Sequence, residues 1–304
     1  MEKLFNPGSI VILGLSGKPS NVPRLILENL IQWGYRGHIF GVNPNGYDIQ
    51  IRGVKIYSGI ESLPIAPDLC VAMIPAKFIP DTVTACGRAG IRWVAISSAG
   101  FNETGEEGEK LAEQTLEIAR KYGIRFVGPN GLTVANTANG LCLPFVPVCK
   151  PLKGGLSIIT QSGGLGLTLF NLNIGIAKFA SIGNKLDLNE IDFLEYFGKD
   201  PETSAIGIYL ESIAHGRKFI ETASRIKKPI IVLKAGNTSA GNRAAMSHTA
   251  AISNNEDIID SAFERAGIIR ISSFTDFISI VKAFKLPPLR GNRLMIMSPT
   301  RRFG

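Results

Sequence analysis

The sequence has no long uninterrupted apolar segment. Although 45% of its 304 residues are hydrophobic, no window approaches the roughly 18 consecutive apolar residues that a membrane-spanning helix needs. The first apolar stretch, "SIVILGLSG", is short, lacks a basic flank and runs into a glycine turn, which is typical of a first β-strand and not of a secretion signal. We therefore expect a cytoplasmic protein with no membrane partner.

Histidine and cysteine, the usual ligands of structural metals, are scarce, with three and four copies respectively. The four cysteines have no C-x-x-C spacing, and two of them lie in apolar or helical segments. This pattern argues against a zinc site or a disulfide framework and favours buried thiols. We expect no metal bound by this chain itself. The cysteines are Cys70, Cys86, Cys142 and Cys149.

The chain also lacks any concentrated basic run, although its formal net charge is +8. A basic surface gathers polyanions, so this charge could indicate nucleic-acid binding. However, lysine and arginine are spread along the chain, and no basic run reaches five residues. A small phosphorylated ligand explains the excess equally well, and we expect no nucleic-acid partner.

What the sequence does contain is a regular alternation of short β-rich apolar segments with amphipathic segments of helical length. This alternation is typical of βαβ units around a parallel sheet. In the first half we expect strands at 9–14, 38–44, 68–75, 92–100 and 125–130, and helices at 23–33, 78–89 and 105–122. In the second half we expect strands at 156–160, 179–183, 205–211 and 229–236, and helices from about 165 and at 189–198 and 216–226.

A proline- and glycine-rich segment, "LPFVPVCKPLKGG" at 143–155, breaks both periodicities and indicates a domain boundary. We expect an α/β protein with a Rossmann-like domain over 1–146 and a flavodoxin-like domain over 147–288, both with parallel sheets. A second linker signal, "LPPLRG", precedes residues 289–304, which look like the start of an incomplete third domain.

The segment "VILGLSGKPS" places Gly14, Ser16, Gly17 and Lys18 between the first strand and the first long helix. Backbone N–H groups and a helix N-terminus can bind phosphate at such a junction. The spacing is not G-x-G-x-x-G, and the second strand ends in "GVNPNG" without an acid for the ribose of NAD, so both features argue against a dehydrogenase. A ligand with a phosphorylated ribose, such as coenzyme A, suits this site. The alternative is that the glycines only shape a packing turn.

Three further strand ends should lie on the same carboxyl edge of the sheet, where open α/β folds bind ligands. They are "IPAK" at 74–77, "SSAGF" at 97–101 and "GPNG" at 128–131. Lys77 and Arg24 are candidate basic neighbours of the ligand. Because these segments share one edge of the sheet, we expect them to line a single ligand-binding cleft.

His248 lies in a segment, 235–253, that is almost free of bulky side chains. Loops of this length are usually functional or disordered. A neutral imidazole is nucleophilic near pH 7 and can accept a phosphoryl group as a reactive phosphoramidate. The alternative is a structural histidine. Ser253 and Glu256 should form the capping box of the next helix.

Two other segments offer what a phosphohistidine needs. "TQSGGLG" at 160–166 is a second strand–glycine–helix junction, where N–H groups and the helix dipole can stabilise a phosphate. Glu211 ends a strand at the ligand edge, where its carboxylate could hold one imidazole nitrogen while the other attacks. Packing glycines and a surface carboxylate are the alternatives. The phosphate-stabilising candidates are Ser162, Gly163 and Gly164.

Six segments together resemble a known family: "GPNGLT", "TQSGGLG", "GNKLDLNEIDFLEYFGKDPET", "YLES", "VLKAGNTSAGNRAAMSHTAAI" and "DSAFERAGIIRI". They are similar to the nucleoside-diphosphate-forming acyl-CoA synthetases and, more distantly, to the succinyl-CoA synthetase α subunit. The resemblance runs from about residue 8 to residue 298.

The resemblance implies a CoA-binding domain followed by a CoA-ligase domain, acting reversibly on acid, CoA and ATP to give acyl-CoA, ADP and phosphate. It implies that His248 is phosphorylated, that Glu211 stabilises it and that the helix start at Ser162 and Gly163 faces it. The phosphoryl group would pass to the acid, and the CoA thiol would open the acyl phosphate. The implied CoA contacts are Gly14, Ser16, Gly17, Lys18, Asn43, Pro75 and Lys77.

Departures from the family pattern are Gly131 in place of cysteine and Ala250 in place of glycine. No segment resembles an ATP-grasp nucleotide site. We therefore expect ATP or ADP with Mg²⁺ to bind an ATP-grasp β subunit or domain in a hetero-oligomer, and the chain alone not to turn over. The substrate should be a small carboxylic acid. The alternative function is a non-catalytic CoA-sensing or truncated ligase-like module.

Overall fold

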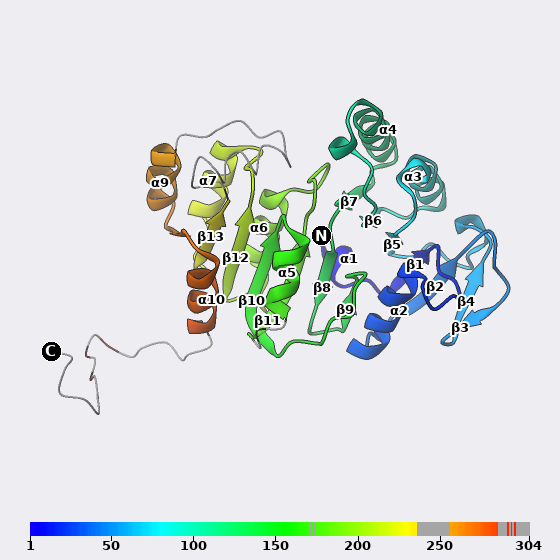
Figure 1. Ribbon diagram of the computed structural model, residues 1–304, viewed down its shortest axis with the longest axis horizontal. Helices are drawn as coiled ribbons and strands as arrows, with labels where there is room; N and C mark the ends of the chain where they lie inside the picture. Colours follow the sequence, from blue (N-terminus) through cyan, green and yellow to red (C-terminus); the bar gives the residue numbers. More distant parts are fainter. Residues whose placement is uncertain are drawn as a thin grey trace.

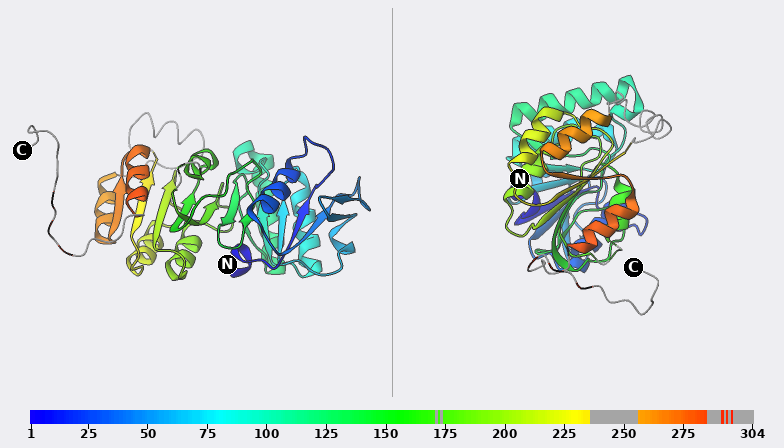
Figure 2. Two further views of the ribbon diagram at one scale, coloured as in Figure 1. Left: turned by 90° about the horizontal axis from the view of Figure 1, so that it is seen from below. Right: turned by 90° about the vertical axis from the view of Figure 1, so that its left-hand side faces the viewer.

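The computed structural model describes residues 1–170, 172, 174–235 and 256–284, with the single residues 291, 293 and 295. The strands in these ranges form two seven-stranded sheets that lie side by side along the length of the molecule (Figure 1). Helices cover the sheets on both faces (Figure 2). The two-domain α/β prediction is therefore confirmed.

The first sheet has the strand order β3-β4-β2-β1-β5-β6-β7. All neighbours are parallel except β3 and β4. Its strands are β1 (Ser9–Leu13), β2 (His38–Val42), β3 (Gln50–Ile51), β4 (Val54–Tyr57), β5 (Leu69–Ala72), β6 (Trp93–Ile96) and β7 (Arg125–Val127). The helices around it are α1 (Glu2–Phe5), α2 (Val22–Trp33), α3 (Ile79–Ala89) and α4 (Glu106–Tyr122).

Alternate residues of β1 face two different cores, because successive side chains of a strand point to opposite faces. Ile10 and Ile12 belong to the same buried cluster as Leu27 of α2. Val11 belongs to the cluster that contains Val83 of α3. The central strand of the first domain is therefore fully buried, which its continuous apolar sequence predicts.

The second sheet has the order β14-β13-β12-β10-β11-β8-β9. Helices α5 (Gly163–Phe170) and α10 (Phe274–Ala283) lie on one face, and α6 (Glu190–Lys199), α7 (Gly216–Ser224) and α9 (Glu256–Arg265) on the other (Figure 2). The strands are β8 (Thr133–Asn136), β9 (Leu141–Cys142), β10 (Lys153–Thr160), β11 (Ile176–Ser181), β12 (Ala205–Leu210), β13 (Ile230–Lys234) and β14 (Ile268–Ile271).

The expectation of purely parallel sheets needs a correction at the edges. Strand β3 pairs antiparallel with β4, and β8 pairs antiparallel with both β11 and β9. The strands β8 and β9 lie within 1–146, the range predicted for the first domain, but they extend the second sheet. The exact domain boundary stays a prediction.

A segment that follows β11 joins the two sheets. The backbone N–H groups of Asn184, Leu186 and Leu188 donate to the carbonyls of Pro129, Gly128 and Phe126 at 2.9, 3.1 and 3.1 Å. In addition, the Arg125 guanidinium lies 3.0 Å from the Asp187 carboxylate. We call residues 183–188 the junction segment. It connects the end of β7 with the second sheet.

Three of the four cysteines, Cys70, Cys86 and Cys142, are buried free thiols, as expected, whereas Cys149 is exposed. Burial raises the pKa of the Cys142 thiol. Within the described ranges no group of three or more histidine, cysteine, aspartate or glutamate side chains could hold a metal ion. No helix of the described part is both long and apolar enough to cross a membrane.

Candidate functional sites

The first candidate site lies where the strand order reverses. The chain passes from β1 to β2 on one side and later returns to β5 on the other side of β1. Open α/β sheets bind ligands at such a switch point, outside the carboxyl ends of the strands. Gly14 follows β1, Asn43 follows β2 and Pro75 lies shortly after β5. The structure thus brings these three predicted CoA contacts to three adjacent strand ends.

Gly14 has a backbone conformation that favours glycine. Its φ is +73°, and a Cβ atom there would lie 3.2 Å from the Cγ2 atom of Ile74. Its N–H donates to the Val42 carbonyl at 2.8 Å. A side chain at this position would both strain the turn and press on the neighbouring strand end.

Two asparagines hold the turn between β1 and α2. The Asn21 amide donates to the Gly14 carbonyl at 3.0 Å, and its Oδ1 accepts the N–H groups of Ser16 and Arg24, both at 3.1 Å. The Asn43 amide donates to the Leu15 carbonyl at 3.1 Å. Asn43 therefore positions the turn from the neighbouring strand, whereas Asn21 caps α2 and shapes the turn from within.

The basic candidates line the outer side of this turn. Lys18 and Lys77 are both exposed, and the Lys77 ammonium lies 5.0 Å from the centre of the Phe78 ring. The Arg24 guanidinium donates to the Gly17 carbonyl at 2.9 Å. An anionic ligand at the turn would therefore meet exposed lysines and an arginine that is hydrogen-bonded to the backbone.

The second candidate site lies at the switch point of the second sheet, between β10 and β12. Gln161 follows β10, and its side-chain Oε1 accepts the N–H groups of Glu211 and Ser212 at 3.0 and 3.2 Å. Thr160, the last residue of β10, pairs with Tyr209, two residues before Glu211. The structure thus brings the predicted helix start and the predicted carboxylate to adjacent strand ends.

Ser162 directly precedes α5 and caps it. Its carbonyl accepts the Gly166 N–H at 3.2 Å, and its Oγ lies 3.5 Å from the Leu165 nitrogen. A Cβ atom on Gly163 would lie 3.1 Å from the Leu132 side chain, whereas one on Gly164 would meet nothing within 4 Å. Gly163 is therefore a packing glycine, and Gly164 is the residue that leaves the helix start open to solvent.

The Glu211 carboxylate has a detectable effect on its neighbour. Burial first, and then the negative charge of Glu211, raise the pKa of the Tyr209 hydroxyl. The charge of Glu211 therefore lies close enough to act on the Tyr209 hydroxyl. His248, Ala250 and Ser253 lie outside the described residues.

Four residues at these sites were not predicted from the sequence: Asn21, Gln161, Lys185 and Glu190. Asn21 had a local signal, because it precedes a proline at the start of a helix and is an N-cap candidate. Lys185 and Glu190 stand within one of the six family segments, but their spacing alone assigns them no role. Gln161 acts on residues fifty positions away, which no local pattern reveals.

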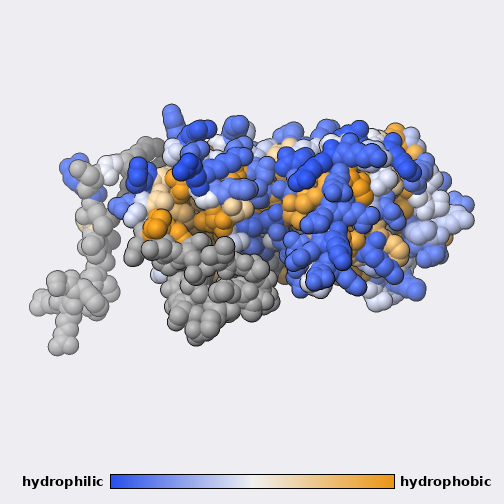
Figure 3. Space-filling model, turned by 90° about the horizontal axis from the view of Figure 1, so that it is seen from above, coloured by the Kyte–Doolittle hydropathy of each residue, from blue (hydrophilic) through white to orange (hydrophobic). Residues whose placement is uncertain are grey.

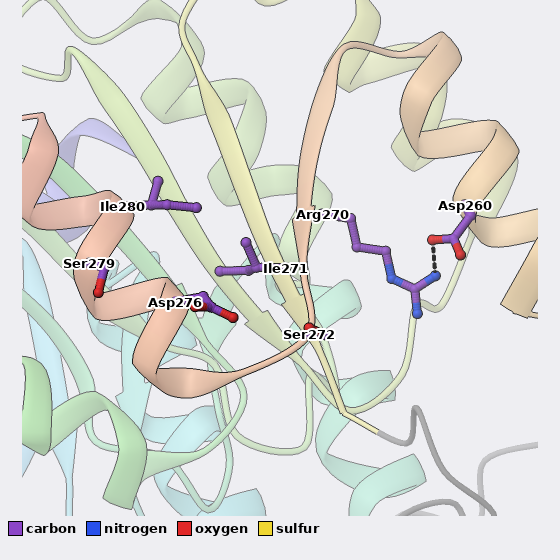
Figure 4. Close-up of a pocket in the computed structure, with 7 residues that line it drawn as sticks. All are labelled: Asp260, Arg270, Ile271, Ser272, Asp276, Ser279 and Ile280. Atoms are coloured by element: carbon purple, nitrogen blue, oxygen red, sulfur yellow. Dashed lines mark hydrogen bonds and ion pairs between the residues drawn. The ribbon is translucent and has the colours of Figure 1, made fainter. Parts of the chain in front are cut away.

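Two surface hollows of the described part lie away from both switch points. One of about 730 Å³ lies between α7 and α9 and is lined in part by Ile220 and the exposed Ile258. Figure 3 shows apolar surface toward the left end of the face that it draws. Another hollow, of about 610 Å³, lies beside β14 and contains the ion pair of Arg270 with Asp260 (Figure 4). Both are open, and neither is lined by a predicted site residue.

Gly131, where the family pattern has cysteine, is tightly enclosed. A Cβ atom there would lie 2.7 Å from the Ser181 carbonyl oxygen and 3.0 Å from the Gly183 nitrogen. In this chain the backbone of the junction segment therefore occupies the space that a side chain would need.

Two family profiles match the chain. The profile of a CoA binding domain matches residues 8–137, and that of a succinyl-CoA ligase like flavodoxin domain matches residues 153–284. They cover the two sheets almost completely. The predicted order of a CoA-binding domain and a CoA-ligase domain is thus confirmed.

Curated relatives cover nearly the whole chain. The α subunit of acetate–CoA ligase (ADP-forming) I from Pyrococcus furiosus is 39% identical over 98% of this chain and 66% of its own length. Acetate–CoA ligase (ADP-forming) II from Archaeoglobus fulgidus is 39% identical over 99% of this chain and 45% of its own. This chain therefore spans two thirds or less of these proteins.

A solved structure agrees with the sequence relatives. The dinucleotide-forming acetyl-coenzyme A synthetase 1 of Ca. Korarchaeum cryptofilum, in complex with phosphate and ADP, superimposes with a TM-score of 0.89 at 39% identity. The match covers 95% of this chain and 63% of that one. Two matching profiles, close relatives and a matching structure together show that the chain belongs to the nucleoside-diphosphate-forming acyl-CoA synthetase family.

Proposed function

We propose that the protein is the CoA-binding, phosphohistidine-carrying subunit of an ADP-forming acid–CoA ligase. The observation that carries this proposal is the pair of switch-point sites, one in each sheet, with the Gln161 side chain joining the start of α5 to the Glu211 backbone at the second. Family membership supports the same assignment.

In this proposal CoA binds at the first site. The N–H groups of Gly14 and Ser16 already donate to Val42 and Asn21, so the exposed Gly17 and Lys18 offer their backbone N–H groups to the phosphates of CoA. Asn43, Pro75 and Lys77 complete the contacts from the adjacent strand ends. Since no acid follows β2, a phosphorylated ribose meets no like charge there. The thiol would then extend toward the second sheet.

The second site would handle the phosphoryl group. Glu211 accepts one imidazole N–H of His248, and the other nitrogen takes the γ-phosphoryl group of ATP, releasing ADP. The start of α5, with Ser162, Gly163 and Gly164, stabilises the phosphoryl oxygens through its N–H groups and dipole. The phosphoryl group next passes to the carboxylate of the acid, which gives an acyl phosphate and restores His248. Attack by the CoA thiol then forms the thioester and expels inorganic phosphate.

The nucleotide would bind elsewhere. We propose that ATP or ADP, with Mg²⁺, binds an ATP-grasp β subunit or domain, so that the working enzyme is a cytoplasmic hetero-oligomer. The name of the Pyrococcus furiosus relative, which is an α subunit, supports a partner subunit. A small carboxylic acid such as acetate is the proposed substrate. We propose domains over 1–146 and 147–288, with β8 and β9 of the first range extending the second sheet.

Radiolabelled ATP tests this function. The complex with its ATP-grasp partner, given Mg²⁺ and γ-labelled ATP, should form an acid-labile, base-stable phosphoryl adduct that is absent in His248→Asn. His38→Asn, on an exposed strand residue of the first domain, is the matched control and should label normally. Label that does not depend on His248 would overturn the proposal. Tight CoA binding without any label would favour the non-catalytic CoA-sensing module.

A further inference from the structure

Lys185, in the junction segment, contacts the second site. Lys185 has a left-handed backbone, with φ at +56°, an uncommon conformation for a residue with a side chain. Its side chain is only 6% exposed. A strained backbone conformation persists only where surrounding contacts stabilise it, so the contacts of Lys185 indicate its role.

The Lys185 ammonium has two hydrogen-bond acceptors on Ser212 and one ion-pair partner, Glu190. It donates to the Ser212 carbonyl at 2.8 Å and to the Ser212 hydroxyl at 3.2 Å, and it lies 3.1 Å from the Glu190 carboxylate. Ser212 directly follows Glu211 in the chain. The Lys185 ammonium therefore binds the backbone of Ser212, the residue next to the proposed catalytic carboxylate of Glu211.

Glu190 completes this arrangement from the first residue of α6. Its side chain is fully buried, and its Oε1 accepts the Ala214 N–H at 2.9 Å. Among the described residues no group donates a hydrogen bond to its Oε2. The positive charge of Lys185, 3.1 Å away, offsets the negative charge of this oxygen. The positive end of α6 also stabilises the carboxylate.

The turn after β12 is thus held from two sides. Gln161 accepts the N–H groups of Glu211 and Ser212, while Lys185 binds the Ser212 carbonyl and Glu190 binds Ala214. Because the junction segment also bonds to residues 126–130, the position of Lys185 is fixed by the first domain as well. Together these contacts restrict the backbone at Glu211.

We propose that Lys185 is a positioning residue for Glu211 in phosphoryl transfer, acting through Ser212 and paired with Glu190. This inference rests on the proposed function of Glu211. Removing a group that orients a functional side chain typically lowers activity by about 10–100-fold. Lys185 does not touch the reacting atoms, so its loss should slow phosphorylation without weakening CoA binding.

The test uses the complete complex and a variant that leaves no unpaired buried charge. Lys185→Met combined with Glu190→Gln removes both charges of the pair. Strand β11 supplies the control, because the ammonium of Lys178, 1% exposed, lies 2.8 Å from the Asp200 carboxylate and 2.7 Å from the carboxylate of the more exposed Glu202. Lys178→Met combined with Asp200→Asn removes the buried pair and leaves only the more exposed Glu202, next to the amino end of β12 and away from the site.

We expect the Lys185/Glu190 variant to form phosphohistidine from γ-labelled ATP about 10–100-fold more slowly, with the Kd for CoA within a factor of about 2. The Lys178/Asp200 variant should label at the wild-type rate even if its melting temperature falls as much. Amide hydrogen exchange at Glu211 and Ser212 should accelerate only in the first variant.

Equal labelling rates in the two double variants, or rates that simply follow their melting temperatures, would overturn the role of Lys185. Absence of label in the wild type would instead overturn the proposed function. Amide exchange separates these failures, because it reports the positioning of Glu211 whether or not phosphorylation occurs.

Discussion

The two strand–glycine–helix turns differ in length and in how they are held. The first spans the eight residues between β1 and α2, and the side chains of Asn21 and Asn43 hold it. In the second only Gln161 and Ser162 separate β10 from α5, so the helix starts close to the sheet. A long turn can follow an extended ligand such as CoA, whereas a short one presents a single helix start to a small anion. The length of the turn thus sets the size of the ligand at an otherwise similar switch point.

If this contrast is right, changes at the second turn should affect phosphoryl transfer alone. Glu211→Gln keeps the shape of the side chain but removes the charge that orients an imidazole, so we expect phosphohistidine yield or lifetime to fall by about 10–100-fold. Quantifying labelled adduct over time, beside isothermal titration with CoA, measures both properties. Glu221→Gln on the exposed surface of α7 is the control. An unchanged adduct would remove Glu211 from the mechanism.

Changes at the first turn should have the opposite effect. Gly14→Val places a β-branched side chain where φ is +73° and where Ile74 lies 3.2 Å from the new Cβ. Left-handed backbone costs a residue with a side chain about 1–2 kcal/mol, which corresponds to a loss in CoA affinity of about tenfold. Titration with CoA measures the loss, and labelling of His248 by ATP should persist.

Gly17 provides the matched control in the same turn. A Cβ atom there would meet nothing within 4 Å, and its φ is not in the left-handed range. Because Gly17 is itself a proposed CoA contact but keeps its N–H group as alanine, Gly17→Ala should lower CoA affinity less than Gly14→Val does. Comparable losses in both variants would mean that the turn needs glycine for reasons other than backbone geometry.

The smallest expected effect concerns stability at low pH. It depends on one ion pair in each region, which differ in burial. Burial alone would raise the pKa of Asp200, but hydrogen bonds from Lys178 and Thr203 outweigh it and hold this pKa below its ordinary value. The corresponding pair beside the first turn, Glu28 with Arg52, is largely exposed and contributes little.

Asp200 has a lowered pKa in the folded state, so it stabilises the fold above its unfolded pKa of about 3.9. This stabilisation is lost as the pH falls through the folded value. Melting temperatures measured between about pH 5 and pH 2.5 should therefore fall less steeply in Asp200→Asn than in the wild type. Parallel curves would show that other carboxylates control acid unfolding.

Much of the fold could be predicted because most elements are encoded locally. The apolar strands β1, β5, β10 and β13 and the capped helices α2, α4 and α6 all lie within a few residues of the expected ranges. The short strands β3, β4, β8 and β9 were missed, since two to four residues give no readable period. Their pairing also depends on partners far away in the chain.

The candidate sites divide in the same way. Gly14, Ser162 and Glu211 follow predicted strands, so their place at a carboxyl edge could be inferred from order alone. Gln161 and Lys185 could not be assigned, because their functions depend on contacts with residues 50 and 27 positions away.

The sequence by itself determined the alternation of strands and helices, the glycine turns and the candidate reactive groups, because each depends on neighbours in the chain. Only the tertiary structure decided that β8 joins the second sheet, that Gln161 bridges two strand ends and that Lys185 fixes the turn beside Glu211. The physical reason is that sheet order and buried charge pairing are set by contacts between distant segments, whose free energy no local pattern records.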